Sequence, residues 1–368
     1  MFKGNGISKE QLTDTGEPCI LYGELYTKYK SEVISDIFSK TDIDTRKLVK
    51  SKANDVIIPC SGETAVDIAT ARCVPYDNIL LGGDLNIIRL YDCDGSFMSY
   101  QLNGKRKYDI AKVAQGVSVV HLYGDHLKGV KTYNPCLEEQ KKIVRLLSLL
   151  DECIATQNKV IEDLKKLKCA IIEKHYRQAK LHKYKICDLG VPFSVGSLSK
   201  EDLSEEGYEC ILYGELFTTY SCVINEVKSH TNKIANTTLS QKGDLLFPSS
   251  TTVDAVSLIS PSVIDIPNVI LGGDMFGIHI DKKFNAYYLS YYINLIARKK
   301  LAIYAKGSTI IHLHYKDIAK AQLLLPDLCE QDKIAKCMMA EDAKIKVEEQ
   351  LLTILEKQKQ YLLRQMFI

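Results

Sequence analysis

Apolar side chains recur at alternating intervals of four and three residues in two segments of the chain. These segments, residues 136–180 and 327–368, contain neither Gly nor Pro and are rich in Leu, Ile, Lys, Glu and Gln. The apolar positions are Leu147, Leu150, Ile154, Ile161, Leu164 and Ile171 in the first segment, and Met338, Ile345, Leu352, Leu355, Leu362 and Met366 in the second. A spacing of about 3.5 residues sustained over several heptads predicts two long helices that pair as a coiled coil.

Polar residues interrupt both apolar stripes at matching places. Gln157 in the first corresponds to Glu348 in the second, and Lys168 corresponds to Lys359. Polar side chains in a coiled-coil seam fix the register of the helices at some cost in stability. The alternative is that both helices cover a globular core. It fits their length less well, because helices of globular proteins average about 10–14 residues.

An offset of 191 residues relates sequence motifs throughout the chain. CILYGELYTKY at 19–29 returns as CILYGELFTTY at 210–220, and QGVSVVHLYGDHL at 115–127 returns as KGSTIIHLHYKDI at 306–318. Internal repeats of this kind indicate a duplicated architecture. We therefore expect two similar globular domains, residues 1–135 and 181–326, each followed by one of the helical segments, 136–180 and 327–368.

The patterns within each globular domain are mixed. NILLGGDLNIIRL (78–90) and NVILGGDMFGIHI (268–280) are apolar runs broken by a Gly-Gly-Asp turn, which indicates strands, whereas residues 287–300 have helical spacing. The sequence thus predicts an α+β fold for both domains, joined by an antiparallel coiled coil with pseudo-two-fold symmetry. A strand predicted at 183–192 has no counterpart ahead of Phe2.

Composition is that of an ordinary globular protein. Of the 368 residues 46% are hydrophobic and 26% charged, and the formal net charge is +2, so a nucleic-acid-binding surface requires local grouping of basic residues. No apolar run is long enough to span a membrane, and the first residues lack a secretory signal pattern. We therefore expect a cytoplasmic protein without a membrane partner. The 12 Cys lack zinc-binding spacing, which indicates buried thiols.

Motifs of common enzymes are missing from the sequence. There is no GxxxxGK[ST] phosphate loop and no complete dinucleotide fingerprint. NPCL at 134–137 lacks the aromatic ring with which NPPY-type amino-methyltransferases stack a flipped base. We therefore expect neither catalytic residues nor metal ligands. His121 and His312 occupy matching positions, for which a buried hydrogen bond, a nucleic-acid contact and catalysis remain alternatives.

Basic and hydroxyl side chains are grouped in both copies. The run at 105–107 corresponds approximately to the run at 298–300, and each precedes a Gly that is followed by hydroxyl residues. Basic groups bind DNA phosphates, and small polar groups such as those in the divergent loops at 61–64 and 249–252 suit base edges. These groups are the candidates for a nucleic-acid surface.

The opening of each helical segment resembles a known motif. PCLEEQKKI at 135–143 and, weakened, PDLCEQDKI at 326–334 are similar to the P-x-L-E-E-Q-x-K-I element of specificity subunits of type I restriction–modification systems. Such subunits also carry YG-acid-L-Y, SGET, GGD and GSSxxHL elements, which match residues 22–26, 61–64, 82–84 and 116–122 or their repeats. The resemblance covers essentially the whole chain. Cys329 replaces a usual Glu, and Glu341 occupies the place that Leu150 has in the first stripe.

The resemblance implies that each globular domain is a target-recognition domain that reads one half of a bipartite DNA site. The residues expected to contact DNA are Tyr22, Tyr26, Ser61, Glu63, Thr64, Lys105, Arg106, Lys107, Ser118 and His121 in the first domain, and Tyr213, Ser249, Ser250, Thr251, Thr252, Arg298, Lys299, Lys300, Lys306, Thr309 and His312 in the second.

The resemblance further implies that the helices set the distance between the half-sites and dock two methyltransferase subunits, which restriction subunits join. Partner contacts are expected at Leu137, Glu139, Gln140, Ile143, Leu328, Glu330, Gln331 and Ile334. S-adenosylmethionine, ATP and magnesium are expected on those partners, and no cofactor is expected on this chain. The rival hypotheses are a single-chain DNA methyltransferase and a coiled-coil scaffold without a DNA role.

Overall fold

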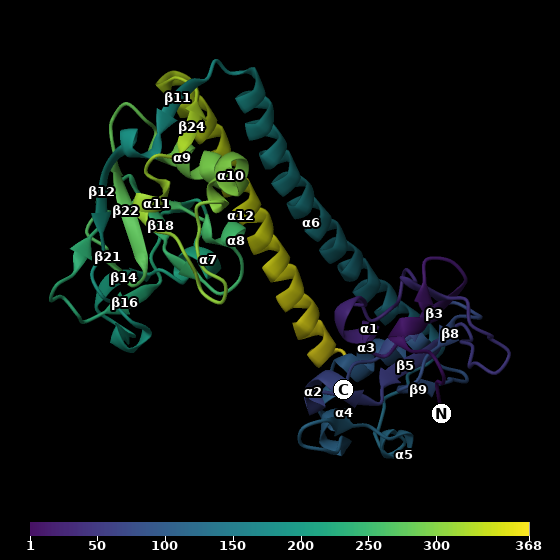
Figure 1. Ribbon diagram of the computed structural model, residues 1–368. Helices are drawn as coiled ribbons and strands as arrows, with labels where there is room; N and C mark the ends of the chain where they lie inside the picture. Colours follow the sequence, from purple (N-terminus) through teal and green to yellow (C-terminus); the bar gives the residue numbers. More distant parts are fainter. Residues whose placement is uncertain (368) are drawn as a thin grey trace. The chain divides into compact units, whose positions relative to one another are not determined.

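The computed structural model describes residues 1–367, which form two units of similar architecture (Figure 1). Unit 1 consists of Met1–Val160 and Glu348–Ile368, and unit 2 consists of Ile161–Val347. Each unit combines one globular head with segments of both long helices, α6 (Leu137–Gln178) and α12 (Leu328–Gln365). We call residues 1–135 head 1 and residues 181–326 head 2.

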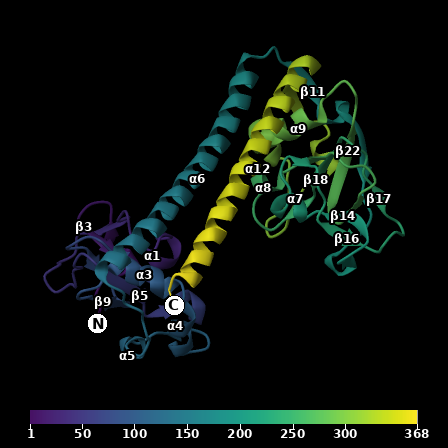
Figure 2. The same ribbon diagram turned by 180° about the vertical axis from the view of Figure 1, so that it is seen from behind.

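The two long helices are antiparallel. In unit 1 the first part of α6 lies beside the last part of α12, and Nε2 of Gln157 donates to Oε2 of Glu348 at 2.6 Å. In unit 2 the last part of α6 lies beside the first part of α12, where Lys168 forms an ion pair with Asp342. Figure 2 shows the helix segments from behind. The predicted fold class, with its coiled coil and pseudo-two-fold repeat, is confirmed.

The apolar stripe forms the seam between the helix segments of each unit. Its members are all shielded from solvent, either buried (Leu147, Ile161, Leu164, Met338 and Ile345) or partly buried (Leu150, Ile154, Ile171, Leu352, Leu355, Leu362 and Met366). Each helix begins shortly after a proline, Pro135 or Pro326. Proline is tolerated at a helix start because amide hydrogens there have no acceptor within the helix. The sequence therefore specifies both the faces and the starts of these helices.

Head 1 contains two four-stranded sheets with strand orders β1-β9-β5-β7 and β2-β4-β3-β8, and a two-stranded sheet of β6 and β10. The strands are β1 (Phe2–Lys3), β2 (Leu12–Thr13), β3 (Glu17–Ile20), β4 (Ser39–Thr41), β5 (Asp55–Pro59), β6 (Ser61–Gly62), β7 (Arg72–Val74), β8 (Leu80–Leu81), β9 (Leu85–Ile88) and β10 (Val120–His121). The helices are η1 (Lys9–Gln11), α1 (Glu24–Thr27), α2 (Ala65–Ile68), α3 (Gly95–Asn103), α4 (Lys107–Val113) and α5 (Gly124–Leu127).

Head 2 repeats this arrangement with sheet orders β12-β22-β18-β20-β15 and β13-β16-β14-β21-β17, and with the pairs β19·β23 and β11·β24. The strands are β11 (His182–Lys185), β12 (Gly190–Ser194), β13 (Leu203–Ser204), β14 (Tyr208–Leu212), β15 (Val223–Ile224), β16 (Ser229–Thr231), β17 (Thr238–Leu239), β18 (Asp244–Pro248), β19 (Ser250–Thr251), β20 (Ser262–Ile264), β21 (Ile270–Gly272), β22 (Met275–Ile280), β23 (Ile311–His312) and β24 (Gln322–Leu325). The helices are η2 (Ile186–Asp188), η3 (Lys200–Asp202), α7 (Glu215–Thr218), α8 (Ala255–Leu258), α9 (Ala286–Tyr292), the π-helical turn η4 (Ile293–Ala297), α10 (Arg298–Ala302) and α11 (Tyr315–Ile318).

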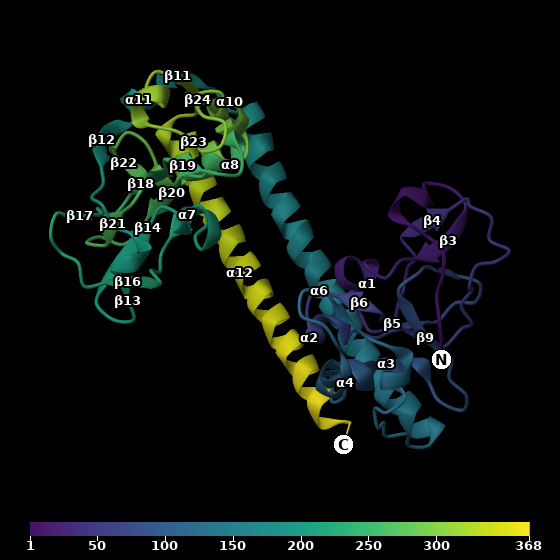
Figure 3. The ribbon, with the colours of Figure 1, turned by 60° about the horizontal axis from the view of Figure 1, so that its bottom comes forward.

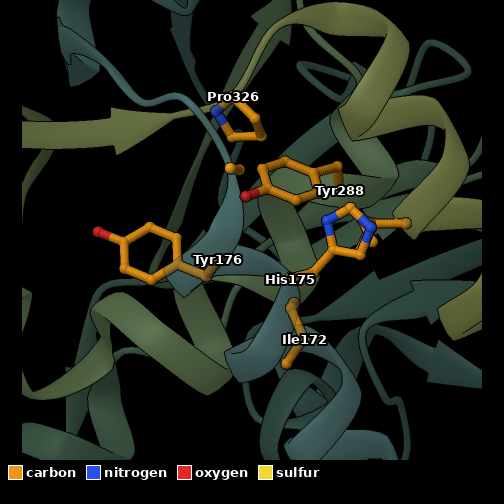
Figure 4. A pocket seen from close by; sticks show the side chains of 7 residues that line it. Ile172, His175, Tyr176, Tyr288 and Pro326 are labelled. Atoms are coloured by element: carbon orange, nitrogen blue, oxygen red, sulfur yellow. The ribbon is translucent and has the colours of Figure 1, made fainter.

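Each head packs onto the long helices through one helix of its own. In unit 1, α3 contributes Phe97 and Tyr100 to a buried cluster with Leu147 of α6 and Leu363 of α12. In unit 2, α9 has the same role. Figure 4 shows the crevice at this junction, where Tyr288 of α9 lies next to His175 of α6 and Pro326. Side chains of the two long helices and the head fill this junction, so it is a packing contact.

Head 2 has five strands where head 1 has four in each larger sheet, and it also has the separate two-stranded sheet of β11 and β24. In unit 2, β11 pairs with β24 along four residues, His182–Lys185 against Gln322–Leu325. The corresponding residues 131–134 of unit 1 are not in a strand. There the side chain of Gln101 donates to the carbonyl of Tyr133 and accepts from its amide, both at 2.7 Å. In head 2 the hydroxyl of Tyr292, at the position of Gln101, accepts from the amide of Leu324 at 3.3 Å, so a side chain from this position bonds the backbone in both heads.

Candidate nucleic-acid interface

A small two-stranded sheet brings separate sequence motifs together in each head. In head 1, β6 pairs with β10 so that Ser61 lies opposite His121. In head 2, β19 pairs with β23 so that Ser250 lies opposite His312. Figure 3 shows β19 and β23 next to α8. The hydroxyl-rich loops and the repeated histidines, about 60 residues apart in sequence, thus share one surface in each unit.

A closed loop precedes the histidine in both heads. Gln115 and His121 exchange two backbone hydrogen bonds of 2.9 and 2.7 Å, and Lys306 and His312 exchange the same two. The glycine after the first residue has a positive φ, +124° at Gly116 and +121° at Gly307, and an added Cβ would clash with a carbonyl oxygen of the loop. Only glycine closes such a loop without strain.

The closed loops expose side chains to solvent. Val117 in head 1 is 97% exposed, and Ser118 beside it is exposed. Thr309 in head 2 is likewise exposed. Small, rigidly held and fully accessible side chains of this kind can enter a groove of DNA.

The Gly-Gly-Asp turn supports the first strand of each small sheet. The carbonyl of Asp84 accepts from the amide of Cys60 at 2.7 Å, and its carboxylate accepts from the hydroxyl of Ser61 at 3.0 Å. The carbonyl of Asp274 accepts from the amide of Ser249 at 2.7 Å. The repeated Gly-Gly-Asp motif therefore holds the backbone at the start of β6 and of β19. The sequence alone did not reveal this role.

Residues of the SGET segment divide between support and exposure. Ser61 is half-buried, whereas Glu63 and Thr64 are exposed, and the hydroxyl of Thr64 caps α2 by accepting from the amide of Asp67 at 3.1 Å. In head 2, Ser249 and Ser250 are buried, Thr251 is half-buried and Thr252 is exposed. The accessible side chains are thus those at the loop tips.

The tyrosines of the YG-acid-L-Y element have two kinds of environment. Tyr22 and Tyr213 are exposed, by 39% and 36%. Tyr26 donates its hydroxyl to the carbonyl of Ser61 at 2.9 Å, and burial raises its pKa. Tyr26 therefore also supports the small sheet, while the first tyrosine of each element remains open to solvent.

The acidic residue of this element is structural. Oε2 of Glu24 accepts from the amide of Leu21 at 2.9 Å, and Glu24 also binds Ser39. Glu215 repeats both contacts with Leu212 and Ser229. This explains why the acidic residue is present in both copies.

The basic runs are only partly accessible. Lys105 is exposed, whereas Arg106 is half-buried with Asp109 at 3.6 Å, and burial together with repulsion from Arg72 lowers the pKa of Lys107.

In head 2, the Nε of Arg298 donates to the carbonyl of Val256 at 2.7 Å, so this guanidinium is used within the fold. Lys299 and Lys300 are exposed. The solvent-facing cations of the two runs are therefore Lys105, Lys299 and Lys300.

An open hollow of about 560 Å³ lies beside the small sheet of head 2. Its lining residues are Asp274, Lys306, Gly307, His312, His314, Lys316 and Asp317. Nζ of Lys306 donates to Oδ1 of Asp317 at 2.6 Å, and the rings of His312 and His314 stack with centroids 6.2 Å apart. The hollow thus presents amino and imidazole groups beside two carboxylates, and Lys316 is its lysine without an ion pair within residues 1–367. Of these groups, the sequence predicted only Lys306 and His312.

Matching positions of head 1 carry different charges. Gln115 and Asp125 stand at the positions of Lys306 and Lys316, and Tyr123 stands where head 2 has His314. Asp125 pairs with Lys128 at 2.7 Å. The same backbone frame therefore carries two lysines and two carboxylates in head 2, whereas head 1 has an uncharged residue and a carboxylate at the positions of the lysines.

The helix-opening motif is partly buried. Gln140 and Gln331 are buried, and each donates to the carbonyl of the preceding proline, at 2.7 and 2.8 Å. Their Oε1 atoms accept from the N-cap amides of α3 and α9, at Asp94 (2.8 Å) and at Asn285 (3.0 Å). These glutamines therefore join each long helix to its head.

The other residues of this motif have graded exposure. Leu137, Glu139 and Leu328 are exposed, Ile143 and Glu330 are half-buried, and Ile334 is buried. Partner contacts at all eight positions of the motif stay predictions. The exposed leucines and Glu139 form the accessible part.

Two kinds of feature are absent from residues 1–367. No group of three or more His, Cys, Asp or Glu side chains in that range is placed to hold a metal ion. None of the described helices is long and apolar enough to cross a membrane.

Comparison with known proteins supports the resemblance found in the sequence. The family described as "Type I restriction modification DNA specificity domain" matches residues 2–166 and 179–357. The specificity subunit of the type I restriction enzyme MjaVIII from Methanocaldococcus jannaschii is 28% identical over 155 residues, which are 42% of this chain and 34% of the relative. The putative MjaX specificity subunit of the same organism is 27% identical over 252 residues, 63% of this chain and 57% of the relative. The alignments thus span about a third and somewhat over half of these relatives.

Solved structures share the fold. The S subunit of a type I restriction–modification system from M. genitalium superposes with a TM-score of 0.62 at 17% identity, covering 100% of this chain and 93% of that one. A chain from a study of complex assembly and conformational transition of the type I system gives 0.57 at 15% identity, covering 90% and 86%. The predicted family resemblance is confirmed.

Proposed function

Because this chain belongs to the type I restriction–modification DNA specificity family, we propose that it is the subunit that selects the DNA sequence on which such a complex acts. The prediction that it is a non-catalytic specificity subunit, and not a single-chain methyltransferase, is confirmed by this membership. Each head would bind one half of a bipartite site in double-stranded DNA. A cytoplasmic location follows from this role, since the DNA to be recognised is there.

The observation that carries the proposal is the repeated surface around the small sheets. In both heads a glycine-closed loop, a histidine and the tip of a hydroxyl-bearing loop meet on one face. The frame of this surface is the same in the two heads, whereas its exposed side chains differ. Because the backbone frame is repeated and the exposed side chains at the loop tips differ, each head can contact the base edges of a different half-site.

Partner subunits complete the proposed complex. The long helices present exposed leucines and Glu139 at the start of α6, and Leu328 at the start of α12, which suit the docking of two methyltransferase subunits. Restriction subunits would join that core. S-adenosylmethionine, ATP and magnesium would be held by these partners, because the chemistry of methyl transfer and cleavage belongs to them.

The test is methylation mapping with half-site resolution. The full chain is co-expressed with a methyltransferase subunit of its own system, and the modified bases of the host genome are sequenced. A bipartite motif is expected. Substituting Thr252 and Thr309 by Ala should then alter recognition in one half only, and substituting Glu63 and Ser118 by Ala should alter the other half.

Four results would count against the proposal. Methylation without a bipartite motif would contradict two separate readings, and loss of both halves from changes in one head would contradict the assignment of one half to each head. If the chain alone bound S-adenosylmethionine, the enzyme hypothesis would gain support. A scaffold without a DNA role predicts that these substitutions leave methylation unchanged.

A further inference from the structure

A buried ion cluster recurs where each head meets the long helices. In unit 1, Nζ of Lys359 binds the carboxylates of Asp151 on α6 and Glu32 of the head, and we call these residues the Lys359 cluster. The hydroxyl of Tyr100 on α3 donates to the same Asp151 at 2.6 Å. Burial would lower the pKa of Lys359, but the two carboxylates outweigh it and raise the value. One ammonium group thus connects α12, α6 and the head.

Unit 2 contains a simpler copy of this ion cluster, which we call the Lys168 cluster. Lys168 of α6 binds Asp342 of α12, and the hydroxyl of Tyr291 on α9 donates to Asp342 at 2.6 Å. All three residues lie 191 positions from their counterparts in unit 1. The position that corresponds to Glu32 is Val223, so only unit 1 has the second carboxylate.

The apolar stripe does not distinguish the observed register from one shifted by a heptad, because apolar positions repeat every seven residues. The clusters do distinguish them. A shift of seven residues in one direction places Lys168 opposite Ala335. It also places Lys359 opposite Val144. A buried charge without a partner is strongly unfavourable. A shift in the other direction places Lys359 opposite the uncharged Asn158, again without a carboxylate on α6, but it places Lys168 opposite Glu349, so only the Lys359 cluster opposes a slip in this direction.

The two units differ in what else fixes the register. In unit 2 the strand after α6 pairs with the strand before α12, residue by residue, from His182 to Lys185. That ladder ties the neighbouring ends of both helices together. In unit 1 the corresponding residues 131–134 form no strand, and the backbone of Tyr133 is bonded by Gln101. The larger ion cluster therefore occurs in the unit whose residues 131–134 have no strand partner within residues 1–367.

We propose that Lys359, with Asp151 and Glu32, is a positioning residue that selects the helix register in unit 1 and seats head 1 on the helix pair. Lys168 and Asp342 have the same role in unit 2, where the strand ladder shares it. The link to DNA rests on the proposed function. A slip of one heptad moves a helix by about 10 Å along its partner, the rise of about three base pairs.

The test measures register directly by photo-cross-linking in the full-length chain. A benzoylphenylalanine at the exposed position Cys153 reports on α12. Since Asp151 faces Lys359, position 153 faces the region of Lys357, and a heptad slip moves this contact to about residue 350 or 364. The variant carries Lys359→Met, Asp151→Leu, Glu32→Gln, Tyr100→Phe and Ser31→Ala, because the hydroxyl of Ser31 also donates to Asp151 at 3.1 Å. Slipped cross-links should rise about tenfold.

The matched control is the same chemistry in unit 2. Its variant carries Lys168→Met, Asp342→Leu and Tyr291→Phe, with the photo-reactive residue at Lys344, which faces the region of Lys166. The strand ladder remains, so slipped cross-links should rise far less than in unit 1. The melting temperature should fall little in either variant, because replacing a whole buried ion cluster by apolar groups is often neutral.

A single cross-linking site at about residue 357 in the unit 1 variant would overturn the proposal, whatever its melting temperature. A lower melting temperature with a single site would show that the cluster contributes stability only. Equal slippage in both units would overturn the role given to the ladder. If the apolar variant does not fold, the exchange Lys359→Asp with Asp151→Lys and Glu32→Gln serves instead, and it must retain one register. No DNA is involved, so failure of DNA recognition is detected separately.

Discussion

Arg89 and Asp55 form a two-point ion pair inside head 1. Nε and Nη2 of the guanidinium donate to Oδ1 and Oδ2 of the carboxylate at 2.9 and 2.7 Å, and the guanidinium lies 4.8 Å from the ring centroid of Phe2. Asp55 is only 1% exposed. Phe2 is in β1 and Asp55 is in β5, two strands of the sheet β1-β9-β5-β7. Arg89 contacts both residues and therefore connects these two strands.

Replacing Arg89 with Ala should destabilise unit 1 by about 2 kcal/mol or more, because it leaves the buried Asp55 without its charged partner. Urea unfolding of the full chain, followed by circular dichroism, measures the loss. Arg46→Ala is the control, since its pair with Asp44 is solvent-exposed on both sides and should leave the unfolding midpoint unchanged. Equal midpoints for both variants would contradict the importance assigned to the buried pair.

Head 2 has a different pair at the same place. Nδ1 of His279 lies 2.6 Å from Oδ1 of Asp244, and the imidazole stacks on Phe193 with centroids 4.2 Å apart. The aromatic residue and the carboxylate are repeated, but the imidazole of His279 replaces the guanidinium of Arg89. The duplicated heads thus keep the geometry of this contact and differ in its chemistry.

The pH dependence of unit 2 stability should include a contribution from Asp317. The hydrogen bond from Lys306 is the main cause that lowers the pKa of this carboxyl below 3.8. The folded state then binds fewer protons than the unfolded state, so the stabilisation is complete above pH 3.8 and is lost as pH falls through the folded pKa. The effect should be less than about 1 kcal/mol, because Lys306 is well solvated.

Lys306→Met should therefore reduce the free energy of unfolding at pH 6 and leave it unchanged below the folded pKa of Asp317. Thermal unfolding of the full chain between pH 2.5 and 6 measures the difference. Lys316→Met is the matched control from the same hollow, since no ion pair of Lys316 is present within residues 1–367. A loss that is the same at every pH would show that Lys306 acts by packing and not through Asp317.

The buried glutamines separate structural from partner-binding roles in the helix-opening motif. Gln140→Ala or Gln331→Ala should each cost about 2 kcal/mol, because a backbone amide and a backbone carbonyl lose their buried side-chain partner. Glu139→Ala should leave the free energy of unfolding unchanged, since this side chain is exposed. If the proposed docking surface is correct, Glu139→Ala should weaken co-purification of the methyltransferase subunit. The reverse pattern would assign the glutamines to the partner interface.

Long-range features of the fold could be predicted because their signals are periodic. Leu147 and Met338 lie in stripes that specify a helix face without knowledge of any neighbour, and the 191-residue offset shows which stripes correspond. The sequence also indicated that Lys168 and Lys359 interrupt the seam. It could not show that each binds a carboxylate on the other helix, because an antiparallel pairing brings together residues such as Lys168 and Asp342 that no local pattern connects.

The candidate interface was predictable only in part. Ser61 and His121 were recognised as repeated polar residues, but their places opposite each other depend on strand pairing. His314 and Lys316 were missed because their charge matters only when the hollow beside β23 is formed. Comparison of matched positions in the two copies carried a usable signal, since Lys316 stands where head 1 has Asp125.

The glycines of the closed loops, Gly116 and Gly307, can be compared with an unconstrained glycine, Gly23. Gly116→Ala and Gly307→Ala place a side chain at a positive φ and against a loop carbonyl, so each should destabilise its unit by about 1–3 kcal/mol. At Gly23 an added Cβ would meet no heavy atom within 4 Å, and the backbone has a helical φ of −65°. Gly23→Ala should therefore be neutral or slightly stabilising. Differential scanning calorimetry of the three variants decides, and equal melting temperatures would show that the loops adjust without strain.

The charge difference between the two heads leads to a prediction about salt. Lys306→Gln with Lys316→Asp gives head 2 the residues of head 1, and should lower the slope of log affinity against log salt concentration by about 0.9 for each phosphate that head 2 no longer neutralises. Gln115→Lys with Asp125→Lys makes the opposite exchange in head 1 and should raise the slope. Fluorescence anisotropy of the assembled complex on a duplex carrying its mapped site measures both. Lys183→Gln, at an exposed position on β11, is the control for the loss of a cation away from the hollow. Equal slopes for the head 2 variant and this control would place the phosphate contacts outside the hollow, even if the complex still recognised its site.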